Sequence, residues 1–184
     1  MLEKIGLQFE VEPSNYEEDI TPKLKPHELA KSLSFKKAKA VASKHKNALV
    51  IAADTFIVLR GKVLGKPHTE TEAKRMLETI NGKPHLVVTG FTIIDTESNK
   101  TLTKSVQTKV YIKRLTPDEI DAYVKSKEPL DKAGGYAIQE LGSVIVERIE
   151  GDYFNVIGLP LSALTESLKE FGVNILIDLH QQDS

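Results

Sequence analysis

The chain has 184 residues, of which 40% are hydrophobic and 28% are charged, and its formal net charge at pH 7 is -1. This balance excludes the strongly basic surface of a nucleic-acid-binding protein, and the absence of cysteine excludes disulfides, thiolate metal sites and a cysteine nucleophile. The first residues lack the apolar core of a signal peptide, and no apolar run has the length of a membrane span. We therefore expect a cytoplasmic protein that binds neither nucleic acid nor membrane.

The first third of the chain contains one predicted helix between two predicted strands. Residues 9–13, "FEVEP", alternate apolar and charged side chains, which is typical of a short half-exposed strand. Pro26 suits the first turn of a helix, which we expect to run to about Lys46. Residues 48–59, "ALVIAADTFIVL", predict a buried strand, and the turn "RGK" after it allows a hairpin with residues 63–65, "VLG".

Two capping boxes, each with a threonine three residues before a glutamate, predict the starts of two further helices: Thr69 with Glu72, and Thr116 with Glu119. We expect the first of these helices to end at Asn81-Gly82 and the second to end near Ser126. Residues 85–95 and 101–113 lie between the two helices and predict a pair of strands joined by the polar turn "TESNK".

The last third of the chain begins with a long glycine-containing connection over residues 127–142. Residues 143–158 then predict a pair of strands, and the apolar spacing over residues 161–171 predicts an amphipathic helix that ends at Gly172. Residues 174–179, "NILIDL", predict a further short strand. The whole pattern predicts one α/β domain with a mixed sheet, arranged in two lobes.

One carboxylate, Asp54, interrupts the apolar run of residues 48–59. A strand that is buried on both faces reads as a continuous apolar run, and a carboxylate within it must be paired, bind a metal or line a cleft. The alternative is that Asp54 ends the strand and caps a turn, although four more apolar residues follow Thr55. The residues alone leave a functional and a structural role equally open.

Two lysines also stand out. Lys37 follows Leu29 and Leu33 at intervals of four residues, so it lies in line with the apolar face of the predicted helix. A lysine at such a position more often extends from the edge of the core into water. Lys66 lies on a glycine-kinked loop, where a lysine can approach a phosphate as a compact charge, but an exposed turn lysine is commoner.

Residues 128–139, "EPLDKAGGYAIQ", favour a binding loop over a polar surface crossover, because glycines are combined there with Asp131, Lys132 and Gln139, whose polar groups can read a base or bind phosphate. The acidic residues 17–19 are able to hold a hard cation such as Mg²⁺ together with Asp54, although such a cluster is usually a solvated loop. The common phosphate-loop, dinucleotide, zinc-protease and nucleophile-elbow motifs are absent.

Six stretches of the chain, taken in order, resemble the Maf family of nucleoside triphosphate pyrophosphatases. They are "GLQFEVEPSNYEE", "KKAKAVA", "ALVIAADTFIVLRGKVLGKP", "A-KRML-INGKPHLVVTG", "EPLDKAGGYAIQELG" and "GDYFNVIGLPL". Each stretch is weak alone, but six in register are specific, and they span roughly residues 5–173.

The resemblance implies a single Maf-like domain over residues 1–184. The implied fold is α/β of the Maf/ITPase-like type, with a mixed elongated sheet flanked by helices and two lobes around a central cleft. The implied activity is that of a nucleotide diphosphatase, which hydrolyses a nucleoside triphosphate to the monophosphate and pyrophosphate. A divalent metal cation, Mg²⁺ or Mn²⁺, and a homodimer are also implied.

The resemblance further assigns roles to residues of this chain. Asp54 matches the family's catalytic acid–base residue, which would accept a proton from the attacking water or help to hold that water on a metal. Glu18 matches an acidic residue that assists with metal or water. Lys37 and Lys66 match lysines that neutralise the charge of the triphosphate as it shifts in the transition state.

The motifs "ADT" and "GYAIQ" resemble the subfamily that acts on dTTP and UTP, in which the positions of Thr55 and Gln139 matter for specificity. An amide such as that of Gln139 both donates and accepts hydrogen bonds, which suits the edge of uracil or thymine. Clearing modified or non-standard pyrimidine nucleotides, or restraining septum formation, is implied at the level of the family.

The chain departs from the family pattern at its start, where Maf sequences carry a strand and a loop close to S-x-S-P-R-R. The serine and arginines of that loop, which contact phosphate, have no counterpart here. Because the other site residues are intact, we expect a longer natural protein that is a normal enzyme. The alternative is a catalytically impaired nucleotide-binding or septum-formation interaction protein.

Overall fold

The computed structural model describes residues 1–16 and 24–178. Its chain divides into two compact units, which agrees with the two lobes expected from the sequence. Unit 1 comprises residues 1–54, 90–106 and 159–184, and unit 2 comprises residues 55–89 and 107–158. The expectation of one domain over the whole chain stays a prediction. None of the helices in the described part of the chain has the length and apolarity that crossing a membrane requires.

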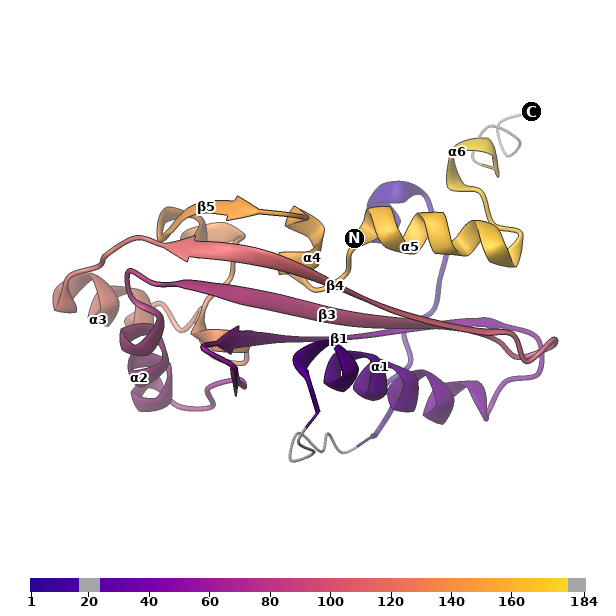
Figure 1. The fold of residues 1–184 in the computed structure, drawn as a ribbon, viewed down its shortest axis with the longest axis horizontal. Coiled ribbons are helices and arrows are strands. Elements are labelled where there is room, and N and C mark those ends of the chain that lie inside the picture. The colour runs from indigo at the N-terminus through magenta and orange to yellow at the C-terminus, as the bar shows by residue number, and fades with distance from the viewer. Residues whose placement is uncertain (17–23, 179–184) are drawn as a thin grey trace. The chain divides into compact units, whose positions relative to one another are not determined.

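The sheet has five strands in the order β2-β1-β3-β4-β5 (Figure 1). The strands are β1 (Leu49–Leu59), β2 (Lys62–Leu64), β3 (Pro84–Asp95), β4 (Thr101–Ile112) and β5 (Val146–Glu150). The α/β class is confirmed, but the sheet is antiparallel rather than mixed. A tight turn joins β1 to β2, and residues 96–100 join β3 to β4. Such short connections produce antiparallel neighbours, whereas parallel neighbours need a long crossover.

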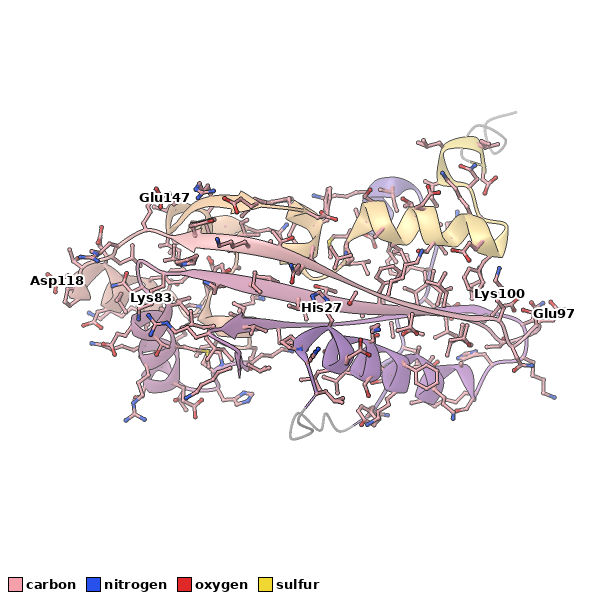
Figure 2. The ribbon with its side chains drawn as sticks, in the orientation of Figure 1. His27, Lys83, Glu97, Lys100, Asp118 and Glu147 are labelled. Atoms are coloured by element: carbon pink, nitrogen blue, oxygen red, sulfur yellow. The ribbon has the colours of Figure 1, made fainter. Side chains whose placement is uncertain are left out.

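In unit 1, helices cover both faces of the strands, with α1 (Pro26–Ala42) on one face and α5 (Leu161–Leu168) on the other (Figure 1). A close approach fixes α1 on β3, because a Cβ atom at Gly90 would lie 2.1 Å from the carbonyl oxygen of Ala30. His27, labelled in Figure 2, places its Nδ1 atom 2.9 Å from Oγ of Ser105 on β4. The rest of unit 1 includes η1 (Glu3–Ile5), η4 (Lys169–Phe171) and α6 (Ile175–Asp178).

Alternation along β1 explains its continuous apolar run. Val50 and Ala52 pack in one apolar cluster with Ala38 of α1. Ile51 and Ala53 point to the opposite face and pack in the cluster that contains the apolar side chains of α5. Because successive strand residues face opposite sides, a strand covered on both faces needs apolar residues at nearly every position.

In unit 2, the core combines apolar side chains of β1, β3 and β4 with those of α2 (Glu70–Ile80) and α3 (Pro117–Lys125). Both helices begin where the capping boxes predict. The box at Thr116 is complete, with Glu119 bonded back to the Thr116 backbone. Thr69 accepts the Glu72 N–H, but the Glu72 carboxylate accepts from the N–H of His68 instead. Unit 2 also contains η2 (Ala133–Gly135), η3 (Glu140–Val144) and α4 (Tyr153–Ile157).

Three expected strand segments are wrong. Residues 9–13 form no strand, and their Glu12 instead pairs with Lys44 and His45. Residues 143–158 contain one strand and a short helix instead of two strands. The helix begins there because the Asp152 side chain accepts hydrogen bonds from the N–H groups of Phe154 and Asn155 and acts as an N-cap. Residues 175–178 are helical, and residue 179 lies outside the described residues. The predicted helix from Pro26 is confirmed, but it ends at Ala42.

Candidate active site

Asp54 lies near the middle of β1 and forms an ion pair with Lys37 of α1. The Nζ atom of Lys37 is 2.6 Å from Oδ1 of Asp54, and the two side chains are 17% and 10% exposed. This geometry follows from the alternation of side chains along a strand and from the spacing of four residues along a helix. Asp54 shares the strand face of Val50 and Ala52, which turns to α1, while the spacing of four along α1 turns Lys37 toward the same strand.

This pair excludes one structural alternative for each residue, while the catalytic roles of both residues stay predictions. Lys37 does not simply extend into water, because its ammonium group contacts a carboxylate that is nearly covered. Asp54 does not end the strand, which continues to Leu59. An ammonium group at hydrogen-bond distance stabilises the ionised carboxylate, and the ionised form is the one that can accept a proton from water.

A groove of about 650 Å³ lies beside this pair in unit 1. The groove is lined by Lys37 of α1, by His45 and Ala48 between α1 and β1, by residues 49–53 of β1 and by residues 8–12 of the N-terminal segment. Asp54 directly follows the last of these strand residues. Lys37 therefore borders a space large enough for a small-molecule ligand.

In unit 2, the structure brings together the two loops that carry three other predicted residues. The N–H of Asp131 donates to the carbonyl of Pro67 over 3.0 Å, and the N–H of Gly134 donates to the carbonyl of Gly65 over 2.9 Å. Lys66 lies between these two carbonyls in sequence, and Lys132 lies between the two donors. Lys66, Asp131 and Lys132 are all exposed, so this pair of loops presents two lysines and a carboxylate to solvent.

Thr55 is bonded within unit 2. Its Oγ1 atom lies 2.8 Å from Oγ1 of Thr89 and 3.3 Å from the carbonyl oxygen of Gly158. Thr89 in turn donates to the carbonyl of Asn155 over 3.1 Å. Each hydroxyl group has one proton, so the two protons are shared among these three contacts, which together link β1 and β3 to the end of α4. Gln139 is exposed and directly precedes η3.

The predicted metal ligands are only partly described. Glu18 lies outside the described residues. In residues 1–16 and 24–178, no group of three or more histidine, cysteine, aspartate or glutamate side chains is arranged to hold a metal ion. Mg²⁺ typically binds one or two protein carboxylates and takes its remaining ligands from water and substrate phosphates. The single carboxylate of Asp54 fits that kind of site and does not fit an all-protein cage.

Sequence reasoning missed the polar residues that hold the predicted loops in place. Glu128 accepts hydrogen bonds from Tyr123 and from two backbone N–H groups, and Tyr123 also accepts from the N–H of Ala137. Thr89 anchors Thr55, as described above. No local pattern marks these residues, because their partners lie on other elements or beyond a loop.

Comparisons with known proteins agree with the sequence resemblance. The family model described as "Maf-like protein" matches residues 1–171. The dTTP/UTP pyrophosphatase of Acetivibrio thermocellus is 47% identical over 183 residues, covering 96% of this chain and 91% of that relative. The proteins of the same name from Methanococcoides burtonii and Bacillus cereus are 48% and 46% identical, and the matches cover 95% of this chain and 89% and 91% of those relatives. With a match over nearly its whole length, this chain belongs to the Maf family.

Proposed function

We propose that this chain is a nucleoside triphosphate pyrophosphatase that hydrolyses dTTP and UTP to the monophosphate and pyrophosphate in the cytoplasm. The observation that carries this proposal is the covered Asp54–Lys37 pair beside a groove, in a chain with relatives of that name. The names of these relatives favour an enzyme over a protein that only binds nucleotides.

In the proposed reaction, a water oxygen bonds to phosphorus, the bond to the pyrophosphate leaving group breaks, and a proton of the water passes to Asp54. Lys37 stabilises the negative charge of the Asp54 carboxylate before this step, and the positive charge of its ammonium group attracts the phosphate groups of the substrate. Lys66 is exposed on a loop whose backbone is held by neighbouring hydrogen bonds, so its ammonium group can neutralise phosphate charge.

A divalent cation, Mg²⁺ or Mn²⁺, is part of the proposal. Asp54 would hold it, with Glu18 as a second carboxylate. When bound, such a cation polarises phosphate oxygens and lowers the pKa of a coordinated water. The chain's own groups orient the water and accept its proton.

Base selection is proposed to depend on Gln139 and Thr55, with Asp131 and Lys132 as further substrate-binding residues. Gln139 is exposed, and its amide can pair with the alternating donor and acceptor edge of uracil or thymine. Thr55 uses its hydroxyl within the protein, so we propose that it supports the site by fixing β1 and the end of α4. A homodimer remains a proposal, which light scattering of the purified chain would test.

Pyrophosphate release from dTTP, UTP, CTP and GTP, measured with Mg²⁺ and with Mn²⁺, tests this function. We expect turnover of dTTP and UTP, and we expect Asp54→Asn to lower kcat by about 10²- to 10⁴-fold, the usual contribution of a positioned general base. Asp118→Asn is the matched control, because Asp118 is exposed in the first turn of α3 (Figure 2). Full activity of a folded Asp54→Asn protein would rule out the proposed role of Asp54.

A further inference from the structure

A single carboxylate holds one end of the loop that carries Gln139. Oε1 of Glu128 accepts the N–H of Gly142 over 2.8 Å, and Oε2 accepts the N–H of Leu141 over 3.0 Å. Both donors belong to η3, which begins directly after Gln139. Hydrogen bonds to an ionised acceptor are stronger than those between neutral groups, so this end of the loop is firmly attached.

The other end of the loop is attached to the same carboxylate through Tyr123. The hydroxyl of Tyr123 donates to Oε1 of Glu128 over 2.8 Å and accepts the N–H of Ala137 over 3.2 Å. Burial raises the pKa of Tyr123 well above its usual value, so the hydroxyl keeps the proton that it donates. One carboxylate thus fixes residue 137 and residues 141–142 together.

The two ends of the loop also touch each other. A Cβ atom at Gly142 would lie 1.8 Å from the carbonyl oxygen of Ala137 and 2.7 Å from the Tyr123 hydroxyl, so only glycine fits there. Residues 138–140 are therefore the tip of a closed loop, and Gln139 and Glu140 are exposed at that tip. The position of Gln139 relative to unit 2 is set by the two ends of its loop.

We propose that Glu128 is the positioning residue for Gln139, and that it thereby sets the preference of the enzyme for uracil and thymine bases over cytosine. This inference rests on the proposed function. An amide recognises a base edge only if its oxygen and nitrogen meet the matching donor and acceptor. If Glu128 no longer holds residues 137–142 in place, we expect the enzyme to lose its selectivity between bases before it loses its hydrolytic activity. Glu128 itself touches neither the phosphates nor the reacting water in this proposal.

Glu128→Gln is the sharpest perturbation, because it keeps the shape of the side chain. A glutamine offers one acceptor oxygen in place of two, so at least one of the N–H groups of Leu141 and Gly142 then faces an amide NH₂ group. We expect amide hydrogen exchange over residues 137–142 to become about tenfold faster, as the loss of one hydrogen bond implies. The ratio of kcat/KM for UTP to that for CTP should fall about tenfold, mainly through a higher KM for UTP.

The control variant is Glu140→Gln, which removes the same charge from the same loop and should change neither quantity. A double-mutant cycle with Gln139→Ala supplies the decisive readout: in the Gln139→Ala protein, Glu128→Gln should have no further effect on selectivity. Additive effects, or an equal loss of kcat for every nucleotide, would overturn the positioning role. If amide hydrogen exchange over residues 137–142 is unchanged in the Glu128→Gln protein, Glu128 does not hold this loop in place, whatever the activity of the variant.

The outcomes separate this inference from the proposed function. Absence of dTTP and UTP turnover in the unmodified chain would overturn the proposed function and the selectivity role with it. The exchange measurement would still decide whether Glu128 clamps the loop. Normal turnover together with an unchanged UTP-to-CTP ratio in Glu128→Gln would overturn only the inference.

Discussion

Replacing Gly134 with alanine should destabilise unit 2 more than any exposed glycine substitution. Gly134 has a φ angle of 72°, in the left-handed region that residues with a Cβ atom avoid. Its added Cβ would also lie 2.1 Å from Cδ1 and 3.1 Å from Cγ1 of Ile57. Ile57 is 1% exposed, so its side chain cannot turn away without displacing the core.

The size of the effect follows from these two causes. A left-handed backbone angle costs an alanine about 1–2 kcal/mol, and forcing extra volume into a packed core costs about 1–3 kcal/mol. We therefore expect Gly134→Ala to lower the free energy of unfolding by about 2–5 kcal/mol. Gly61→Ala is the matched control, because Gly61 has a φ angle of 80° but no atom within 4 Å of an added Cβ. It should show only the backbone cost.

Urea unfolding of the full chain measures both variants, and comparison is valid if the slope with urea is unchanged. Ile57→Val removes the closest methyl group, so in the Gly134→Ala protein it should cost less than its usual ~1 kcal/mol or restore stability. The steric reasoning fails if Gly134→Ala costs no more than Gly61→Ala. Because the N–H of Gly134 holds the carbonyl of Gly65 beside Lys66, the folded variant should also turn over UTP more slowly.

Three further predictions concern other parts of the chain. Burial lowers the pKa of His85 from 6.5 to about 4. The unfolded chain therefore binds a proton that the native chain does not, and stability should fall by about 3 kcal/mol as the pH drops from about 6.5 to about 4; urea midpoints across this range should show a smaller fall in His85→Gln. Thr116→Ala removes a complete capping box and should cost about 1 kcal/mol in urea unfolding, against no cost for a serine replacement. A double-mutant cycle of Lys37→Met with Asp54→Asn should give an interaction free energy of about 1–3 kcal/mol, and a value near zero would mean that the pair contributes nothing.

The parts of the fold that were predictable from sequence depend on local contacts. The capping threonines Thr69 and Thr116 bond to N–H groups three residues away, so the helix starts could be located without tertiary information. Residues 9–13 have strand alternation but no strand partner among the described residues, and alternation cannot supply one. The apolar run at residues 175–178 was too short for its period to distinguish strand from helix.

In the candidate site, too, the sequence indicated individual residues but not the contacts between distant ones. The residue pattern singled out Asp54, Lys37 and Lys66, the resemblance assigned catalytic roles to them, and periodicity placed Lys37 in line with the apolar face of its helix. None of these showed that Lys37 contacts Asp54, because that contact joins residues 17 positions apart on different elements. Glu128 lies within the stretch "EPLDKAGGYAIQELG", but no local pattern marks it as important. The N–H groups that donate hydrogen bonds to it lie 13 and 14 residues later in the chain.

The register of β1 determines that the side chains of Asp54 and Thr55 make different contacts. The two residues are adjacent, so their side chains point to opposite faces of the strand. The carboxylate of Asp54 meets Lys37 of α1 in unit 1, while the hydroxyl of Thr55 meets Thr89 and the end of α4 in unit 2. A shift of β1 by one residue in one direction would place the threonine hydroxyl against the ammonium group of Lys37, and a shift in the other direction would place the carboxylate against Thr89. The continuous apolar packing of Val50 and Ala52 on one face and of Ile51 on the other therefore serves the site directly, because it fixes which face Asp54 occupies.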